Sequence, residues 1–253
     1  DVKEHLLAGC KEIWITSNDT GAYMVEQGGK QKIAELLEQV LSVPMDFKLR
    51  LGMMNPGNTI IILDELIEIY KHPKMFKFLH IPIQSGNNEI LKLMNRKYNA
   101  GDFTKVVEAF RKEIPEITIS TDIIVGFPSE TERQFEDSLN LIKTIKPDVL
   151  NLSRYAAREG TIAAKMKQNS TNTLKQRSRL MTSLYRQIAL ENNKKWLGWH
   201  GKVLIDEKGT YDSWIGRNYC YKPVVVKGDF TLGDEINVII NDVTSFDLRG
   251  EVC

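Results

Sequence analysis

The sequence predicts an α/β protein in which a parallel sheet, open or closed into a barrel, precedes a small antiparallel β-barrel. Three observations support this fold class. Over residues 1–164, short apolar runs alternate with longer amphipathic stretches, as in parallel strands joined by helices. A basic stretch with helical spacing then covers residues 172–196. From Gly198, five short strand-like runs are separated by Gly and Asp, as in a small β-barrel.

The first region contains five predicted strands, each rich in β-branched or aromatic residues and bounded by polar residues, Gly or Pro. They are Glu12–Ser17, Phe47–Met53, Phe76–Ile83, Ile117–Gly126 and Asp148–Ser153. Helical spacing predicts helices over Lys30–Leu41, Thr59–Tyr70, Asn88–Met94, Asp102–Lys112 and Glu130–Ile145. In such a fold, ligand-binding residues collect where the strands end.

The predicted strand ends are unusually polar. They are the segments Thr16–Tyr23, Arg50–Pro56, His80–Asn88, Thr121–Glu132 and Ser153–Thr161. The strongest candidates among them are Arg50, Arg154 and Arg158, because three guanidinium groups would form a positive floor for a carboxylate or phosphate. Each arginine could instead pair with a carboxylate such as Asp19 or Asp122, and the sequence leaves both interpretations open.

Two of these segments, QSGNNEI and GFPSETE, contain helix-capping patterns. Ser129 or Thr131 is placed to cap the helix that follows Gly126, and the free amides of that helix could bind a carboxylate or phosphate. Capping alone is the simpler interpretation. We expect His80 to be a hydrogen-bonded core imidazole rather than a metal ligand.

The charge of the chain is concentrated in one segment. The formal net charge is +1, yet residues 165–195 carry eight Lys and Arg and one Glu. Within the predicted basic helix, Leu180, Leu184, Ile188 and Leu190 form the expected apolar face. The remaining cations form either a solvated face or a surface for an anionic partner. We therefore divide the chain into residues 1–164, a connecting segment over 165–197, and residues 198–253.

Cys10, Cys220 and Cys253 are scattered and form no C-x-x-C pair. They predict neither a disulfide framework nor a zinc or iron–sulfur ligand set, and we expect Cys10 to be buried in the core. No Ser/His/Asp triad or P-loop is present. No apolar run approaches about 18 residues, and the first residues lack the layout of a signal peptide, so we expect a cytoplasmic protein without a membrane segment.

Five motifs in order resemble those of the methylthiotransferases, radical S-adenosylmethionine (SAM) enzymes that act on tRNA or on a ribosomal protein. The motifs are ITSNDTGAY, RLGMMNP, HIPIQSGNNEILKLMNRKY, STDIIVGFPSETE and SRYAAREGTIAAKM. Gly198–Val252 resembles their TRAM domain, so the resemblance covers essentially the whole chain. TSNDTGAY and RLGMMNP are most similar to the archaeal and eukaryotic branch. That branch adds a methylthio group to carbon 2 of N6-threonylcarbamoyladenosine, beside the tRNA anticodon.

The resemblance implies a partial radical SAM barrel, lacking its first strand, followed by a TRAM-like barrel. It also implies how SAM would be held. Ser17, Asn18 and Asp19 would hold the amino group. Polar residues on later strands would hold the ribose and carboxylate, namely Arg50, Gln84, Ser85 and Asp122. The adenine would pack against Ile124 to Gly126 and near Arg154.

The family binds a [4Fe–4S] cluster through a C-x-x-x-C-x-x-C motif after its first strand, and a second cluster in an additional N-terminal domain. This chain contains neither. We therefore expect it to be the C-terminal part of a longer enzyme and inactive by itself, because iron–sulfur clusters need thiolate ligands. In the intact enzyme, a radical derived from SAM would activate the adenine carbon and a second SAM would supply the methyl group.

The expected partner is tRNA, at its anticodon stem-loop. The TRAM-like barrel would stack bases on some of Trp199, Tyr211, Trp214, Tyr219 and Tyr221, of which we expect two to be exposed. Phosphate contacts are expected from Arg158, Lys175, Arg177, Arg179, Lys202, Arg217, Lys222 and Lys227, with Arg186, Lys194 and Lys195 nearby. The sequence carries no signal of oligomeric state.

Three alternatives remain at this stage. The chain could be a non-catalytic RNA-binding protein with a degenerate barrel. It could belong to a methylthiotransferase that acts on another adenosine or on a ribosomal protein. An ordinary barrel enzyme with a phosphorylated substrate is the third, and it has no need of the C-terminal domain.

Overall fold

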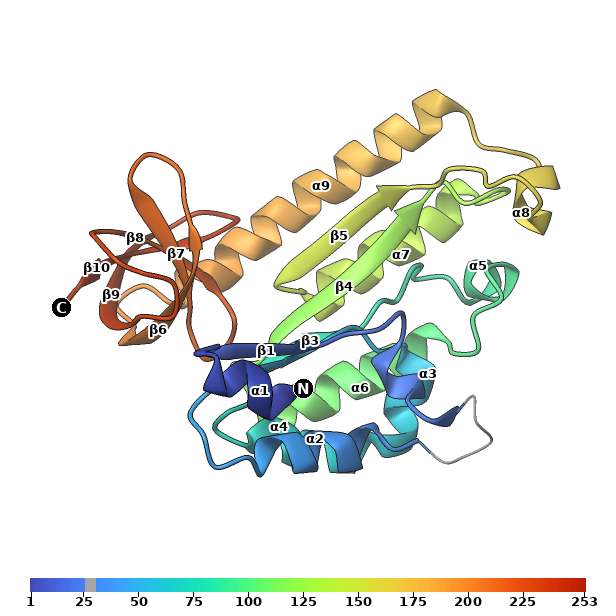
Figure 1. The fold of residues 1–253 in the computed structure, drawn as a ribbon. Helices are drawn as coiled ribbons and strands as arrows, with labels where there is room; N and C mark the ends of the chain where they lie inside the picture. Colours follow the sequence, from blue (N-terminus) through green and yellow to red (C-terminus); the bar gives the residue numbers. More distant parts are fainter. Residues whose placement is uncertain (26–30) are drawn as a thin grey trace.

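The computed structural model describes residues 1–25 and 31–253. It consists of a β/α region, a long connecting helix and a C-terminal β-barrel (Figure 1). The β/α region comprises, in chain order, α1 (Val2–Leu7), β1 (Glu12–Ile15), η1 (Thr20–Ala22), α2 (Ile33–Leu41), β2 (Lys48–Leu51), α3 (Pro56–Thr59), η3 (Ile60–Ile62), α4 (Leu63–Lys71), β3 (Phe78–His80), α5 (Asn88–Leu93), α6 (Ala100–Glu113), β4 (Thr118–Val125), α7 (Glu132–Ile145), β5 (Val149–Arg154) and α8 (Ile162–Lys165). The connecting helix is α9 (Thr171–Lys194), and the barrel strands are β6 (His200–Lys208), β7 (Ser213–Arg217), β8 (Pro223–Lys227), β9 (Glu235–Val243) and β10 (Leu248–Val252).

The five strands of the β/α region are parallel, as predicted. They pair as β1-β2 and β3-β4-β5, and the amide of Phe76 donates to the carbonyl of Leu49 at 2.9 Å to join the two sheets. Each observed strand coincides with a predicted run, although β5 continues one residue further, to Arg154. The carboxyl ends of all five strands therefore lie on the same side of the region (Figure 1).

Helices α2, α4, α6 and α7 match the long predicted helices and bury their apolar faces against the strands. In β2, Leu49 and Leu51 are fully buried, whereas Lys48 and Arg50, which alternate with them, are half-buried. This alternation places apolar side chains toward the helices and charged ones on the opposite face of the sheet. Lys30, where the predicted helix Lys30–Leu41 begins, lies outside the described residues. The short α3 and α8 were not predicted because their four residues each are too few for a periodic pattern.

The C-terminal barrel closes in the strand order β10-β8-β7-β6-β9. Its five strands confirm the predicted small barrel, with one difference: β8 and β10 pair in parallel, with Leu248 opposite Val224. Inward-facing residues of all five strands form a core separate from that of the β/α region. Val203, Val224 and Val238 are among its buried members.

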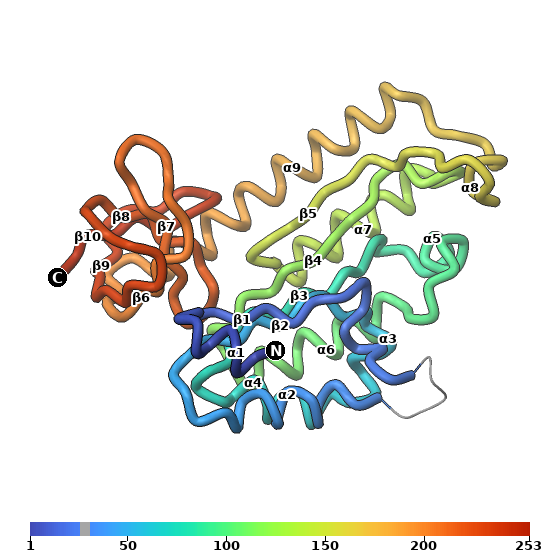
Figure 2. Tube along the Cα trace, in the orientation of Figure 1, coloured from blue at the N-terminus to red at the C-terminus, as the bar shows by residue number. Residues whose placement is uncertain are grey.

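Helix α9 leads the chain back from the carboxyl ends of the strands to their amino ends (Figures 1 and 2). Before its start, the Asn169 side chain donates to the Phe127 carbonyl just beyond β4, at 2.8 Å. At its other end, the Asn193 side chain donates to the Thr244 carbonyl in the barrel, at 2.9 Å. The barrel consequently lies against the amino ends of the strands and leaves their carboxyl ends uncovered.

Two expectations about burial are wrong. Leu180 was assigned to the apolar face of α9, but it is 46% exposed; Ile188 is buried as expected, and Arg177 and Met181 are buried beside it on the same helix. Cys10 was expected in the core but is exposed in the turn between α1 and β1. In the described part of the chain, no helix is both long and apolar enough to cross a membrane.

Candidate functional site

A polar chain crosses the strands near their carboxyl ends. The Asp122 Oδ1 atom on β4 accepts hydrogen bonds from His80 Nε2 at 2.9 Å and from Asn151 Nδ2 at 2.8 Å. Burial opposes ionisation of Asp122, but the His80 and Asn151 bonds outweigh it and hold the pKa of this carboxyl below its usual value. His80 is thus the hydrogen-bonded imidazole that was predicted. Asp122 is ionised, and its Oδ2 makes no hydrogen bond with the residues that the structure describes.

The segment after β1 separates into two exposed residues and one anchor. Ser17 and Asn18 are exposed. The Asp19 carboxylate accepts bonds from the amides of Gly21 at 3.1 Å and Asn55 at 3.2 Å, and from both asparagine side chains, Asn55 and Asn58. Four donors fill its acceptor capacity. Asp19 therefore fixes this loop to α3 and, contrary to expectation, has no free oxygen for a ligand.

Ser17, Asn18 and Asp19 line a cavity of about 550 Å³ together with residues of α2, including Ile33. This cavity contains none of the site residues predicted on later strands. Because β1 and β5 are at opposite ends of the strand order, the predicted residues are spread across the whole strand layer.

Ser85 and Gly126 lie close to helices α7 and α9, respectively. Ser85 is fully buried, and its Oγ accepts the Asn87 amide at 3.2 Å and lies 3.4 Å from the Ser138 hydroxyl on α7. Gly126 has a φ of +75°, and a Cβ there would lie 2.7 Å from Leu174 of α9. Its lack of a side chain lets α9 approach the sheet. The contacts of Ser85 are inconsistent with its assignment to cofactor binding, whereas the assignment of Gly126 stays a prediction.

The expected floor of three guanidinium groups is not assembled. Arg154 and Arg158 are exposed at and beyond the end of β5. Arg50 instead lies 4.5 Å from the centre of the Trp14 ring, 4.8 Å from that of Phe78 and 4.6 Å from that of Tyr221, a residue of the C-terminal barrel. Neither sequence interpretation of Arg50 is correct, since it contacts aromatic rings and pairs with neither Asp19 nor Asp122.

Five predicted residues keep accessible groups at the carboxyl ends: Ser17, Asn18, Asp122, Ile124 and Arg154. Gln84 lies beside them and is 9% exposed. Its backbone N–H donates to the Asp122 backbone carbonyl at 2.8 Å. Together they offer hydroxyl, amide, carboxylate and guanidinium groups next to an apolar side chain. Such a set can bind a ligand that carries an amino group, a carboxylate, hydroxyls and a flat ring.

Among residues 1–25 and 31–253, no group of three His, Cys, Asp or Glu side chains is placed to hold a metal ion. The three cysteines lie in the α1–β1 turn, inside the C-terminal barrel and at the last residue. These residues do not fit an iron–sulfur cluster, which needs several thiolates at one place.

The predicted RNA-binding cations separate into exposed and buried groups. Lys175, Arg179 and Arg186 are exposed, and their spacing of four and seven residues puts them on one face of α9. Arg177, only 4% exposed, bonds Glu130 at 2.7 Å and Glu132 at 3.3 Å. Burial raises the pKa of Glu130, although the Gly126 amide and Arg177 oppose the shift. Arg177 therefore stabilises the packing of α9 and, contrary to expectation, cannot reach RNA.

Lys222 is a second wrong assignment, because it is 4% exposed and its Nζ lies 2.7 Å from Asp148 Oδ1. Arg217 is mostly buried and bonds Asp206 at 2.7 Å. Lys202 is exposed and lies 3.2 Å from Glu235. Of the predicted barrel cations, Lys202 and Lys227 are exposed.

Of the five predicted stacking rings, Tyr211 alone is largely exposed, at 95%, whereas two were expected. Tyr221 is buried against the β/α region, and the other three rings are half-buried. Sequence reasoning missed Phe246, which is 63% exposed and lies 5.6 Å from the Arg186 guanidinium. An aromatic residue in the polar turn NDVTSFD was the available signal.

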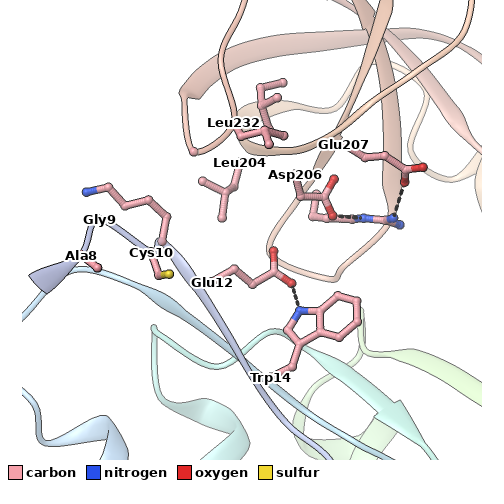
Figure 3. Close-up of a pocket in the computed structure, with 13 residues that line it drawn as sticks. Ala8, Gly9, Cys10, Glu12, Trp14, Leu204, Asp206, Glu207 and Leu232 are labelled. Carbon is pink, nitrogen blue, oxygen red and sulfur yellow. Dashed lines mark hydrogen bonds and ion pairs between the residues drawn. The ribbon is translucent and has the colours of Figure 1, made fainter. Parts of the chain in front are cut away.

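A larger cavity, about 760 Å³, lies at the amino ends of the strands, between the α1–β1 turn and the barrel (Figure 3). Glu12 bonds the Trp14 indole there, and Asp206 bonds Arg217 from the barrel side (Figure 3). Burial raises the pKa of both Glu12 and Asp206. No sequence pattern signals this cavity, because its two walls are almost 200 residues apart in the chain.

Residues 2–142 match the family described as the radical SAM superfamily, and residues 201–253 match the TRAM domain. The chain is 45% identical, over 90% of its length, to a "Probable threonylcarbamoyladenosine tRNA methylthiotransferase" of Pyrococcus horikoshii, of which it covers 54%. It is 35% identical over 98% of its length to the human "Threonylcarbamoyladenosine tRNA methylthiotransferase" and covers 43% of it. The chain thus spans about half the length of these curated relatives.

Two solved structures share the fold. One is coproporphyrinogen III oxidase from Escherichia coli, described as a radical SAM enzyme, with a TM-score of 0.52 and 17% identity over 76% of this chain and 51% of that one. The other is methylornithine synthase, with a TM-score of 0.50 and 14% identity over 73% of this chain and 52% of that one. At these identities the likeness concerns the fold alone.

Proposed function

Because this chain belongs to the radical SAM superfamily, we propose that it is part of a tRNA methylthiotransferase. The intact enzyme would add a methylthio group to carbon 2 of N6-threonylcarbamoyladenosine in the anticodon loop of cytoplasmic tRNA. One observation carries the proposal: a radical SAM region and a TRAM domain occur in one chain, over which relatives named for this activity are 35–45% identical. Their names apply to the whole relatives, so the activity is proposed for a whole protein that contains this chain.

SAM fits the residues left accessible at the carboxyl ends of the strands. Ser17 and Asn18 would bond its amino group, and Asp122 Oδ2, ionised and without a partner among the described residues, would accept from a ribose hydroxyl. Ile124 offers an apolar surface to the adenine, and Arg154 offers a cation to the carboxylate. When bound, SAM supplies the methyl group and the means of activating the substrate carbon.

The chain's own contribution is orientation. Asp19, bonded to Asn55 and Asn58, holds the loop that carries Ser17 and Asn18. His80 and Asn151 hold Asp122 with one oxygen turned away from its partners. The described residues do not supply ligands for an iron–sulfur cluster, so we assign them no step that involves one.

The proposed RNA surface follows the exposed face of α9 from one end of the strands to the other. Arg158, beyond β5, and Lys175, Arg179 and Arg186 on α9 supply the cations. Phe246 next to Arg186, and Tyr211 on the β6–β7 turn, supply exposed rings on which bases can stack. Counterion release from this surface makes the binding salt-dependent.

The test is the nucleoside composition of tRNA from cells that lack the endogenous activity and express the intact protein. We expect the 2-methylthio derivative of N6-threonylcarbamoyladenosine to appear, and to form more slowly when Arg154 is replaced by Ala. A methylthio group on a different adenosine, or on a ribosomal protein, would assign the enzyme to another branch. An RNA that binds tightly yet is never modified would favour the non-catalytic RNA-binding alternative.

A further inference from the structure

One turn of the TRAM barrel is inserted into the β/α region. It is the segment between β7 and β8, residues 218–222, which we call the docking turn. Its Tyr221 is 6% exposed, and its ring centre lies 4.8 Å from that of Phe76 and 5.2 Å from that of Phe78. Tyr221 and the two phenylalanines form a small buried cluster distinct from both domain cores. A side chain of the barrel thus completes packing that begins in the β/α region.

Arg50 is held in the same cluster by aromatic rings. Its guanidinium lies within 5 Å of the Trp14, Phe78 and Tyr221 ring centres, and its Nη1 lies 3.5 Å from the Tyr221 hydroxyl. Its buried Nε has no hydrogen-bond partner among the residues that the structure describes. A second guanidinium, that of Arg217, lies 4.8 Å from the Tyr221 ring centre. Cation–π attraction is strongest where water is excluded, so the contacts of Arg50 and Arg217 with the Tyr221 ring stabilise the buried position of this ring.

Polar contacts hold both flanks of the docking turn. The Lys77 amide donates to the Tyr219 carbonyl at 2.8 Å, and the Tyr219 hydroxyl bonds Glu116. Lys222 Nζ bonds Asp148 at 2.7 Å and Asn193 of α9 at 3.0 Å. The turn therefore contacts the chain just before β3, β4 and β5, as well as the end of α9.

The shape of the turn is itself costly. Tyr221 has a φ of +61°, a left-handed conformation that a bulky residue rarely adopts. The Asn218 side chain stabilises it by accepting the amides of Cys220 and Lys222, both at 3.0 Å. Tyr at a position that favours Gly indicates that the ring, rather than the turn alone, is required there.

We propose that the docking turn locks the TRAM barrel to the β/α region, with Tyr221 and Arg50 as positioning residues that set where TRAM-bound RNA lies relative to the strand ends. Apart from this turn, the barrel is held by the end of α9, where Asn193 bonds Thr244, and the chain enters it through Leu197 and Gly198. Gly198 has a φ of +79°, and among the described residues no atom beyond its chain neighbours lies within 4 Å of the position that a Cβ would take. The catalytic part of this inference rests on the proposed function, whereas the locking part does not.

The locking part is tested on the 253-residue chain by double electron–electron resonance, which measures the distance between two spin labels. Cys10 and Cys253 are replaced by Ser, and spin labels are placed at the exposed positions 112 on α6 and 227 at the end of β8. We expect one narrow distance distribution, which Tyr221→Ala broadens by several ångströms. Tyr211→Ala, which removes an exposed ring from the same domain, leaves it narrow. Tyr221→Phe, which keeps the ring, also stays narrow.

If Tyr221→Ala does not fold, Arg50→Gln replaces it, because it removes one cation and leaves every ring in place. A narrow distribution in whichever of these variants folds would overturn the lock. Arg50→Lys is expected to broaden the distribution as well, because an ammonium group cannot stack flat between rings.

The positioning part is tested in the intact protein by comparing tRNA affinity with turnover. We expect Tyr221→Ala to lower kcat for tRNA modification at least tenfold with the Kd for tRNA within twofold, and Tyr221→Phe to restore kcat. Equal losses in Kd and kcat, or no loss in kcat, would contradict a positioning role. If the unsubstituted protein modifies no tRNA, the proposed function fails, and the distance measurements still decide whether the turn is a lock.

Discussion

The two ends of the parallel strands use the same residue types in opposite ways. At the carboxyl ends, Asp122 and Arg154 keep groups accessible to a ligand. Where the TRAM barrel docks, Arg50 of β2 stacks on Tyr221 of the barrel, and Asp148, just before β5, bonds Lys222 of the barrel. A charged residue at one end is thus available for binding, whereas at the other it holds two domains together. The difference arises because α9 brings the barrel to the amino ends alone.

The largest expected effect separates the two uses within α9. Arg177→Leu leaves Glu130, whose side chain is 1% exposed, without its cation, and the free energy of unfolding in urea should fall by about 3–5 kcal/mol. Arg179→Leu, two residues away and exposed, should change it by less than about 0.5 kcal/mol. If Arg177→Leu lowered the free energy of unfolding as little as Arg179→Leu does, the Arg177–Glu130 pair would not be structural.

The next effect concerns activity rather than stability. In the intact protein, Arg154→Ala should lower kcat/KM by about 10- to 100-fold, the value of one charged hydrogen bond, with unfolding unchanged. Ser85→Ala is the matched contrast at a buried position. It should lower the free energy of unfolding by about 1 kcal/mol with kcat/KM unaltered, because its hydroxyl bonds only the protein. The comparison between accessible and enclosed residues breaks down if the two variants exchange these phenotypes.

A smaller effect is expected on tRNA binding by the chain itself. Replacing Lys175, Arg179 and Arg186 by Gln together should weaken binding about tenfold and reduce the slope of log K against log salt by about 2. Lys105→Gln with Lys112→Gln, which removes exposed cations from α6, is the control and should leave that slope unchanged. Filter binding between about 50 and 200 mM salt measures both. An unchanged slope in the triple variant would exclude this face of α9 from the RNA surface.

The smallest expected effect is a pH dependence at the domain junction. Burial raises the pKa of Glu12 above its usual 4.5, so the folded chain binds this proton more tightly than the unfolded chain. Glu12 therefore costs stability as the pH rises from 4.5 through the raised pKa. Relative to the unsubstituted chain, Glu12→Gln should gain stability with rising pH in urea unfolding from pH 4 to 8. Glu136→Gln, which removes an exposed charge from α7, is the control. A gain that shrinks as the pH rises would contradict the assignment.

The fold could be predicted well from the sequence, because periodicity reports directly on which face of an element is buried. All five strands of the β/α region and all five of the barrel were located in this way. The fate of single charges could not be predicted so well. Arg177 and Arg179 look alike in the sequence, and only the packing of α9 on α7 buries one and exposes the other.

Predictions of site residues were wrong where the residue that a side chain contacts lies far away in the sequence. Arg50 meets Tyr221 across 171 residues, and no local pattern signals that encounter. Asp19 was placed correctly after β1, but the asparagines that saturate it belong to α3, a four-residue helix with no periodicity of its own. Cys10 was wrongly assigned to the core because cysteine is usually buried, and a turn residue has no pattern to correct that expectation.

The length of α9 sets a size for the substrate. Its 24 residues span about 36 Å, from the carboxyl ends of the strands to the TRAM barrel. With the barrel locked by the docking turn, the distance between the carboxyl strand ends and the TRAM barrel is fixed. A free nucleoside or a dinucleotide can occupy one end only, whereas a folded RNA several nanometres long can reach both. Under the proposed function, the intact protein would thus select its adenosine by the size of the RNA that carries it, before it contacts any base.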